Sequence, residues 1–317
     1  MKRAKSLFCL LLLSFLSWAQ FSYGESRVRV GFLGLAGHWF PLWVALDRGF
    51  FQREGLDVEL IHLNPARLMY SALHSGEIQF AIGSAGSSVL AQSGGLQLQI
   101  IMAVVGQLPF EMWSIPSVTS LKDLKGKKVG GSPGGIPDLI IEQALKKVGL
   151  TTRDILRYNI GENTQRFAAL KVGVVDVTVI APPLTHLAKQ EGFHRLARAS
   201  EIVPEVSAAS VTVKKDYLKR NQEIALKFSR ALVNAIQFSK TKSAEAIETI
   251  TKWTKQKAEL AQDTYETVVP LLVSDGRENL EGIRLVIEYS LDKGLLKGHF
   301  SPQQFVDLEF QKRLLAR

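Results

Sequence analysis

The sequence contains almost no cysteine. Its one cysteine, Cys9, lies in an apolar run near the N-terminus. A single cysteine cannot form a disulfide framework or a cysteine-ligated metal site, and it leaves the rest of the chain without thiol chemistry. The six histidines give no zinc motif, because none stands four residues before another. We therefore expect no metal ion and no cofactor.

Long hydrophobic runs and blocks of like charge are also missing. The apolar run at residues 7–19 is shorter than the roughly 20 residues that a membrane-spanning helix needs. Hydrophobic residues make up 46% and charged residues 22% of the 317 positions, which excludes disordered and multi-span membrane proteins. Lys and Arg exceed Asp and Glu by 39 to 30, but acids interrupt the densest basic clusters, at residues 122–128 and 214–220. We expect no nucleic-acid partner.

The first 24 residues have the pattern of an export signal. A basic head at residues 2–5 precedes an apolar centre at residues 7–16 and a tail with small residues at residues 22–24. We expect cleavage after Gly24, with Ala19 as the second choice. The cysteine lies inside the apolar centre rather than at the cleavage point, so no lipid anchor is expected. The sequence thus predicts a soluble protein of the periplasm.

Strands and helices alternate through the first two thirds of the chain. Short β-branched runs bounded by glycine are separated by segments of helical period, whereas only helical patterns follow Lys214. This alternation predicts an α/β fold with largely parallel sheets and a helical C-terminal third. The predicted strands lie at residues 28–33, 56–63, 78–82, 98–105, 128–131, 156–160, 174–180 and 208–213, and the predicted C-terminal helices at residues 222–239, 244–253, 260–272, 279–291 and 302–315.

An internal echo indicates two similar lobes. Residues 72–82 read ALHSGEIQFAI and residues 169–179 read ALKVGVVDVTV, and both predict a helix end, a glycine stop and a strand. Each predicted strand runs into a loop of small residues before the next helix. Open α/β sheets bind ligands beyond the carboxyl ends of their strands. Two lobes that face each other through such edges would form a cleft.

Two segments carry a resemblance to a known family. Residues 38–60 read HWFPLWVALDRGFFQREGLDVEL, and residues 120–129 read SLKDLKGKKV. The first resembles the opening motif of solute-binding proteins of the nitrate, sulfonate, taurine and thiamine-precursor group, and the second resembles the segment by which that family enters its second lobe. The resemblance covers about residues 28–185. It implies a type II periplasmic-binding fold and delivery of a captured small molecule to an ABC importer.

The resemblance and the strand pattern together give a domain layout. We expect a signal peptide at residues 1–24, a first lobe at residues 25–113 and 212–317, and a second lobe at residues 114–211. A monomer of this layout would close on a small polar or anionic organic molecule and present it to the permease subunits of the importer. The alternative is an extracytoplasmic sensor with the same lobe pair.

The loops that leave the predicted strands supply the candidate ligand-binding residues. Helix N-termini at such loops favour negative charge, and glycines allow close approach of backbone N–H groups. For Trp39 the alternative role is packing, and for Ser84 and Ser87 it is helix capping. Arg166, one turn into a predicted helix, either pairs with an anion or is solvated. The candidates are His38, Trp39, Ser84, Ser87, Ser132, Gly134, Gly135 and Asn163.

Enzyme functions find little support in the sequence. The turn Gly130-Gly131-Ser132-Pro133-Gly134 matches the serine-hydrolase motif, and Asp275 and His299 follow in the order of a catalytic triad. The residue after the nucleophile would be a proline, which has no N–H for an oxyanion hole. Certain cytoplasmic relatives of the family synthesise the thiamine pyrimidine and carry a cysteine-rich motif that this chain lacks. We therefore expect a protein that is not an enzyme.

The export signal gives a first prediction. N-terminal sequencing of the protein from its native cell should find a mature chain that starts near Glu25, in the soluble extracytoplasmic fraction. A chain that keeps Met1 in the cytosol would rule out the transport role.

Overall fold

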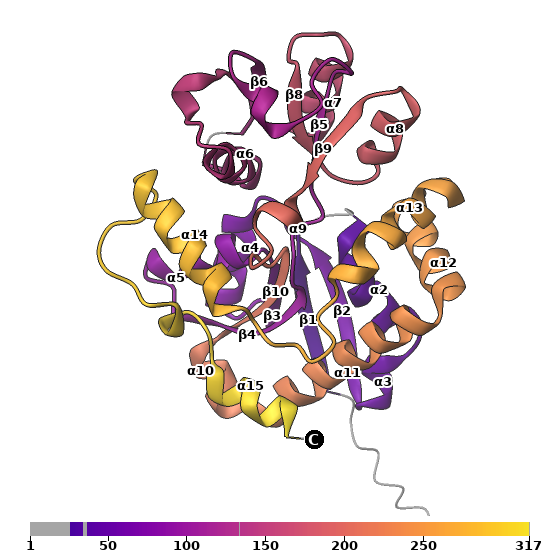
Figure 1. Cartoon of the computed structure of the whole chain (residues 1–317). Coiled ribbons are helices and arrows are strands. Elements are labelled where there is room, and N and C mark those ends of the chain that lie inside the picture. The colour runs from indigo at the N-terminus through magenta and orange to yellow at the C-terminus, as the bar shows by residue number, and fades with distance from the viewer. Residues whose placement is uncertain (1–25, 34–36, 133, 317) are drawn as a thin grey trace, which may run out of the picture.

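The chain folds around two five-stranded sheets, one in each of two lobes (Figure 1). The computed structural model describes residues 26–33, 37–132 and 134–316. The predicted export signal at residues 1–24 therefore lies outside the described residues. In the described part of the chain, no helix is long and apolar enough to cross a membrane. The arrangement confirms the predicted two-lobed α/β fold with a helical C-terminal third.

The sheet of the first lobe has the strand order β2-β1-β3-β10-β4. Strands β2, β1 and β3 are parallel, whereas β10 runs antiparallel to both β3 and β4. The strand β10 comes back from the second lobe, so it enters the sheet from the opposite direction. The bounds are β1 Ser26–Phe32, β2 Leu56–His62, β3 Phe80–Gly83, β4 Leu98–Val105 and β10 Ala209–Lys214.

The sheet of the second lobe has the order β7-β6-β8-β5-β9. Strands β7, β6 and β8 are parallel, and β5 runs antiparallel to β8 and β9. Because the fifth strand of each sheet is antiparallel to the fourth, four strands of each sheet run in one direction and one runs against them, which confirms the prediction of largely parallel sheets. The bounds are β5 Glu111–Ser114, β6 Lys128–Gly131, β7 Leu156–Asn159, β8 Val177–Ile180 and β9 His194–Arg198.

The two sheets share one pattern. In each, three parallel strands are followed by one antiparallel strand and a fifth strand antiparallel to that. The sequence echo falls on the matching central strands, β3 and β8, which follow Gly76 and Gly173 with positive φ values of 90° and 74°. Glycine reaches this left-handed backbone at low cost, which explains why both helices stop there. The echo is thus a structural repeat.

Helices cover both faces of the first sheet. Helices α2, α3 and α11 pack together on one side, whereas α4 and α5 lie on the other, with α14 against α5 (Figure 1). The bounds are α2 Phe40–Asp47, α3 Phe50–Arg53, α4 Ala66–Ser75, α5 Ala85–Ser93, α6 Ile136–Lys147, α7 Asn163–Lys171, α8 Leu184–Gln190, α9 Ala199–Ile202, α10 Lys215–Arg220, α11 Gln222–Thr241, α12 Ser243–Thr254, α13 Ala258–Val268, α14 Leu280–Asp292 and α15 Leu308–Leu315. The 3-10 turns are η2 Gly37–Trp39, η3 Leu121–Leu124, η4 Thr152–Asp154, η5 Val269–Leu271 and η6 Pro302–Gln304, so the helix predicted at residues 302–315 is a turn followed by α15.

The opening motif folds as its residue types require. Pro41 stands in the first turn of α2, where its missing N–H costs nothing, and Gly49 takes a φ of 69° between α2 and α3. Phe51 is 1% exposed and stacks on Phe228 of α11 at 5.1 Å between ring centroids. Phe228 also stacks on Phe80 of β3 at 4.2 Å. Such pairs add about 0.5 to 1.5 kcal/mol each beyond burial, so they fix α3 and α11 to the sheet.

Two chain segments join the lobes, at residues 106–110 and 199–208. They lie near the crossings expected at residues 113 and 212, although the lobe boundaries themselves stay a prediction. The second segment is held tightly, because a Cβ atom added to Gly282 of α14 would lie 1.9 Å from the Glu205 carbonyl oxygen. The backbone of α14 therefore packs directly on this crossing.

Two helix glycines test that packing. Gly282→Ala should lower the free energy of unfolding by at least about 2 kcal/mol, because the methyl group would collide with backbone rather than with a flexible side chain. Gly86→Ala is the matched control, since it also lies in the first turn of a helix and its added Cβ would meet nothing closer than Val286 at 3.6 Å.

The control should lose no stability and gain up to about 1 kcal/mol, because alanine favours helix over glycine. Urea unfolding of both variants measures the difference. Equal effects of the two substitutions would contradict the close packing of α14 on the crossing.

Candidate functional site

The carboxyl ends of the strands in the two sheets face each other. Strands β1 to β4 all run in one direction, so the chain leaves β4 at their common carboxyl edge. It then enters β5, whose first residue lies at the carboxyl edge of β6 and β8 because β5 is antiparallel to β8. The loops after these strands therefore border the space between the lobes, where ligands bind in open α/β sheets.

His38 and Trp39 lie in η2, after β1. Trp39 is 4% exposed and belongs to the main hydrophobic core, so in this structure its side chain packs in the core. Its ring centroid lies 4.2 Å from that of His38. Burial lowers the pKa of His38 to about 4, which leaves the imidazole neutral at neutral pH. Ligand contact by either residue stays a prediction, and His38 would offer a hydrogen bond rather than a charge.

Ser84 and Ser87 form the start of α5. The Ser84 Oγ accepts a hydrogen bond from the Ser87 backbone N–H at 3.2 Å, which confirms the helix-capping alternative. The Ser87 hydroxyl lies 3.2 Å from the hydroxyl of Tyr70 on α4. Burial raises the pKa of Tyr70, so the phenol stays protonated. These hydroxyls form a polar cluster at the carboxyl edge of β3, and their contact with a solute stays a prediction.

The second-lobe loop after β6 reaches toward the first lobe. Gly134 has a φ of 74°, and its N–H donates to Oδ2 of Asp138 at 3.3 Å. Gly135 precedes α6 and donates to the Ser132 carbonyl oxygen at 2.9 Å. A Cβ atom on Gly134 would lie 3.4 Å from the Leu295 side chain, which follows α14. At Gly134 the loop thus approaches the first lobe with backbone alone, so a backbone N–H group can come close to a ligand between the lobes.

Asn163 and Arg166 hold a cleft loop in place. The Asn163 Oδ1 accepts from the Ala181 N–H at 3.1 Å, and its Nδ2 donates to the Ala181 carbonyl at 3.3 Å. Arg166 is 3% exposed and donates to the carbonyl oxygens of Val179, Ile160 and Gly161. The expectation of a solvated Arg166 is therefore wrong, whereas its pairing with an anionic ligand stays a prediction. Burial lowers its pKa to about 10, so it remains a cation beneath the carboxyl edge.

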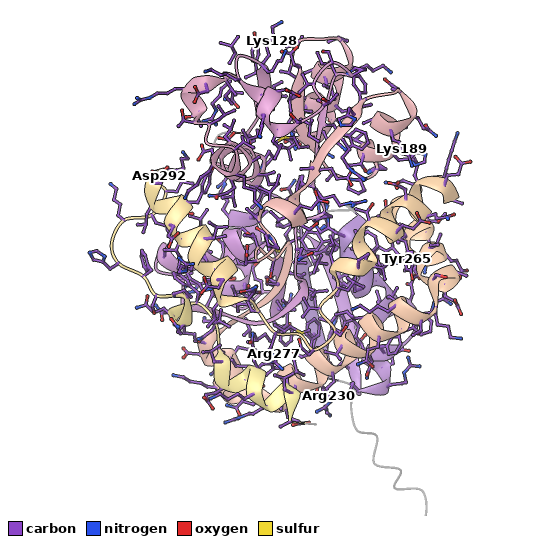
Figure 2. The ribbon with its side chains drawn as sticks, in the orientation of Figure 1. Lys128, Lys189, Arg230, Tyr265, Arg277 and Asp292 are labelled. Carbon is purple, nitrogen blue, oxygen red and sulfur yellow. The ribbon has the colours of Figure 1, made fainter. Side chains whose placement is uncertain are left out.

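The residues of the hydrolase motif do not come together. Ser132 lies in the second lobe, whereas Asp275 forms an ion pair with Arg277 at 3.0 Å. Asp275 also lines a cavity of about 360 Å³ beside α11 and α15, at the opposite end of the molecule from α6 (Figures 1 and 2). His299 is exposed on the chain after α14. A catalytic triad needs its base within hydrogen-bond reach of the serine, and this arrangement does not supply it.

A cavity of about 580 Å³ opens between the lobes beside the first crossing. The second lobe contributes β5, α8 and β9, and the first lobe contributes α13 and η5. None of the eight residues predicted from the sequence lines this cavity. Its lining residues are Gln107, Leu108, Pro109, Phe110, Glu111, Trp113, Thr185, Lys189, Arg195, Arg198, Ser200, Asp263, Glu266, Thr267, Pro270 and Leu271.

A buried carboxylate anchors the second-lobe wall of the cavity. Glu111 is 5% exposed and accepts from the Trp113 Nε1 at 3.0 Å. Its Oε1 lies 3.2 Å from Arg195 Nη1 and 3.5 Å from Arg198 Nε. Burial raises the pKa of Glu111, while the two guanidinium groups oppose that rise. The carboxylate positions both arginines at the mouth of the cavity.

Polar contacts bridge the lobes on both flanks of the crossings. Lys293 after α14 lies 2.8 Å from Glu142 of α6, and His186 of α8 lies 3.4 Å from Asp263 of α13. Figure 2 shows the two flanks through Asp292 and Lys189. Such partly exposed pairs are worth about 0 to 1 kcal/mol each.

Sequence reasoning missed the lining residues for a physical reason. Several of them lie on β5 and β9, and these strands read EMWS and HRLAR, with no β-branched residue. One signal was available in Glu111, a single acid followed by Met112 and Trp113 in an apolar segment. A buried acid needs hydrogen-bond donors or cationic partners, and Arg195 and Arg198 are the cationic partners of Glu111.

A second buried carboxyl group lies where the chain re-enters the first sheet. Glu278 is 6% exposed and accepts hydrogen bonds from the hydroxyls of Ser207 and Ser210. No cation forms an ion pair with it among the described residues. Burial raises the pKa of Glu278, although both hydroxyls oppose that rise. The group ties the second crossing to the segment before α14.

The matching sheets, the facing carboxyl edges and the two crossings define a two-lobed periplasmic-binding fold. The periplasmic aliphatic sulphonate binding protein SsuA of Escherichia coli has this fold, with a TM-score of 0.77 and 15% identity over 90% of this chain and 99% of SsuA. Residues 37–246 match the NMT1/THI5-like family model. The chain belongs to the NMT1/THI5-like family.

Two curated relatives are similar to most of the chain. YtlA of Bacillus subtilis, which is named as a binding protein, is 27% identical over 232 residues, covering 70% of this chain and 69% of YtlA. A Haemophilus influenzae protein named for thiamine biosynthesis is 25% identical over 270 residues, covering 80% of this chain and 82% of the relative. The family resemblance predicted from the sequence is confirmed.

Glu278 should make stability depend on pH. Because its folded pKa lies above the ordinary value of 4.5, its contribution is fully present below about pH 4.5 and is lost as pH rises through the folded pKa. Glu278→Gln removes the ionisation and keeps groups that bond both serines. Urea titrations measure the free energy of unfolding of both proteins. The wild-type value minus the variant value should therefore decrease as the pH rises from 4 to 8. A difference that stays constant or rises with pH would contradict this assignment.

Proposed function

We propose that the protein captures a small polar or anionic organic molecule between its lobes and delivers it unchanged to an ABC importer. One observation carries the proposal: both sheets turn their carboxyl edges toward the same space, and two crossings join them there. Loop tips and helix N-termini from two independent lobes can then contact one solute. This arrangement suits reversible capture, because each lobe alone offers only half of a site.

Closure about the crossings is the proposed mechanism. A solute that contacts both lobes stabilises the closed form by its differential affinity for that form, and it shifts the open and closed populations accordingly. The pairs Lys293–Glu142 and His186–Asp263 support this mechanism, since they join the lobes at positions that a hinge motion would separate. Their modest strength leaves the solute as the main determinant of closure.

Similar proteins support the same function. SsuA is named as a periplasmic sulphonate-binding protein and YtlA as a binding protein. We infer from them a small-molecule ligand, a permease partner and a place in the periplasm, which agrees with the export signal expected in the sequence. We also infer that the chain performs no turnover, because Ser132, Asp275 and His299 occupy separate parts of the molecule.

Binding without chemistry is the prediction that follows. A thermal-shift screen of sulfonates, nitrate, thiamine precursors, aromatic acids and small amides should return a ligand. Calorimetry should then give one saturable site per chain, and small-angle scattering should give a smaller radius of gyration at saturation. Mass spectrometry should recover the ligand unaltered after long incubation. A chemically changed ligand would contradict the proposal, and so would identical scattering with and without ligand.

A further inference from the structure

The cavity beside the first crossing has walls of opposite charge. Its second-lobe wall carries Lys189 from α8 and Arg195 and Arg198 from β9, and its first-lobe wall carries Asp263 and Glu266 from α13. The two walls belong to different lobes. Figure 1 shows α8 opposite α13 across the space between the lobes, and Figure 2 places Lys189 on that flank.

The cationic wall carries a positive charge that no carboxylate of the described residues offsets. Glu111 contacts Arg195 and Arg198 at its Oε1, and Glu201 lies 3.7 Å from Arg198, so these two acids offset the charges of the two arginines. Lys189 is exposed at the cavity and forms no ion pair with any carboxylate in the described part of the chain. The wall therefore keeps a net positive charge that an anionic group can contact.

The acidic wall also lacks full compensation. The Asp263 Oδ1 lies 3.4 Å from His186 Nδ1, while Oδ2 is buried and has no hydrogen-bond donor among the described residues. Glu266 accepts a hydrogen bond from the Gln262 amide at 2.9 Å and forms no ion pair with any cation in the described part of the chain. A buried acceptor without a donor costs about 1 to 3 kcal/mol. A ligand ammonium group would supply that donor.

The remaining lining fits a small organic molecule. Thr185 is 4% exposed, and its Oγ1 has no hydrogen-bond partner within the described residues. Phe110, Trp113 and Pro270 add apolar surface between the charged walls. The volume of about 580 Å³ lies within the range of roughly 300 to 1,000 Å³ that small-molecule pockets occupy.

We propose that this cavity binds a zwitterionic solute, with its anionic group at Lys189 and Arg195 and its ammonium group at Asp263 and Glu266. The inference rests on the proposed function and names its substrate class. Because the two charges of the solute meet different lobes, both contacts form only when the lobes close. A simple anion would gain the cationic wall but would face two uncompensated carboxylates across the cavity.

Matched solutes test the charge requirement. Calorimetry at pH 7 should compare ω-amino carboxylates of three to six carbons with the alkanoate and the alkylamine of the same length. We expect one of the zwitterions to bind at least about tenfold more tightly than either singly charged analogue. The zwitterion should also reduce the radius of gyration, whereas the analogues should leave it unchanged.

Three variants test whether the preference for zwitterions comes from the two charged walls of the cavity. Lys189→Ala and Glu266→Gln should each weaken zwitterion binding at least about tenfold, and each should reduce the preference over the analogue that lacks the complementary charge. Lys219→Ala is the control, because Lys219 is an exposed helix lysine on α10, away from the cavity. It should bind the zwitterion as the wild type does.

Three results would overturn the inference and leave the proposed function standing. One is an alkanoate that binds as tightly as the zwitterion of its length. Another is a series in which no zwitterion binds while another compound of the wider screen does. The third is unchanged affinity in both Lys189→Ala and Glu266→Gln, which would overturn the placement. The absence of saturable binding by any compound in the screen would remove the proposed function as well.

Discussion

Two chain crossings fix how everything else in the molecule is arranged. They connect the sheets at residues 106–110 and 199–208, and both leave their sheets at the carboxyl edge. Every loop that follows a parallel strand is therefore turned toward the other lobe. The tight contact of Gly282 with the Glu205 carbonyl, together with the Glu278 bonds to Ser207 and Ser210, anchors the second crossing to the first lobe.

At the cavity beside the first crossing, the two lobes carry opposite charges. Glu111 holds two arginines on the second lobe, and α13 presents acids from the first, so attraction acts across the space that a solute would fill. Arg166 adds a buried cation beneath the loops after β7 and β8, and it donates hydrogen bonds to carbonyl oxygens and to the Asn163 amide oxygen. Enclosure strengthens such interactions because less water screens them.

The sequence predicted the parts of the fold that depend on local pattern. Strands rich in valine and isoleucine, the capping glycines and the opening motif with Pro41 and Gly49 all lie where they were expected. Strands β5 and β9 escaped because EMWS and HRLAR have no strand signature, and the sheet pairing that places them is non-local. The cavity-lining residues on these two strands were missed for the same reason. The burial of Arg166 was not predicted, because the helical period of α7 does not show that the loops after β7 and β8 cover its polar face.

Label-to-label distance across the hinge tests the central claim most directly. Residues 25–317 contain no cysteine, so cysteines introduced at Leu68 of the first lobe and Val172 of the second can carry nitroxide labels without background. These side chains are 49% and 72% exposed, so labels should not disturb packing. Pulsed electron paramagnetic resonance should show the distance distribution shift to a new, narrower position when the tightest-binding compound saturates the protein. An unchanged distribution at a concentration where calorimetry shows full binding would contradict closure of the lobes on the solute.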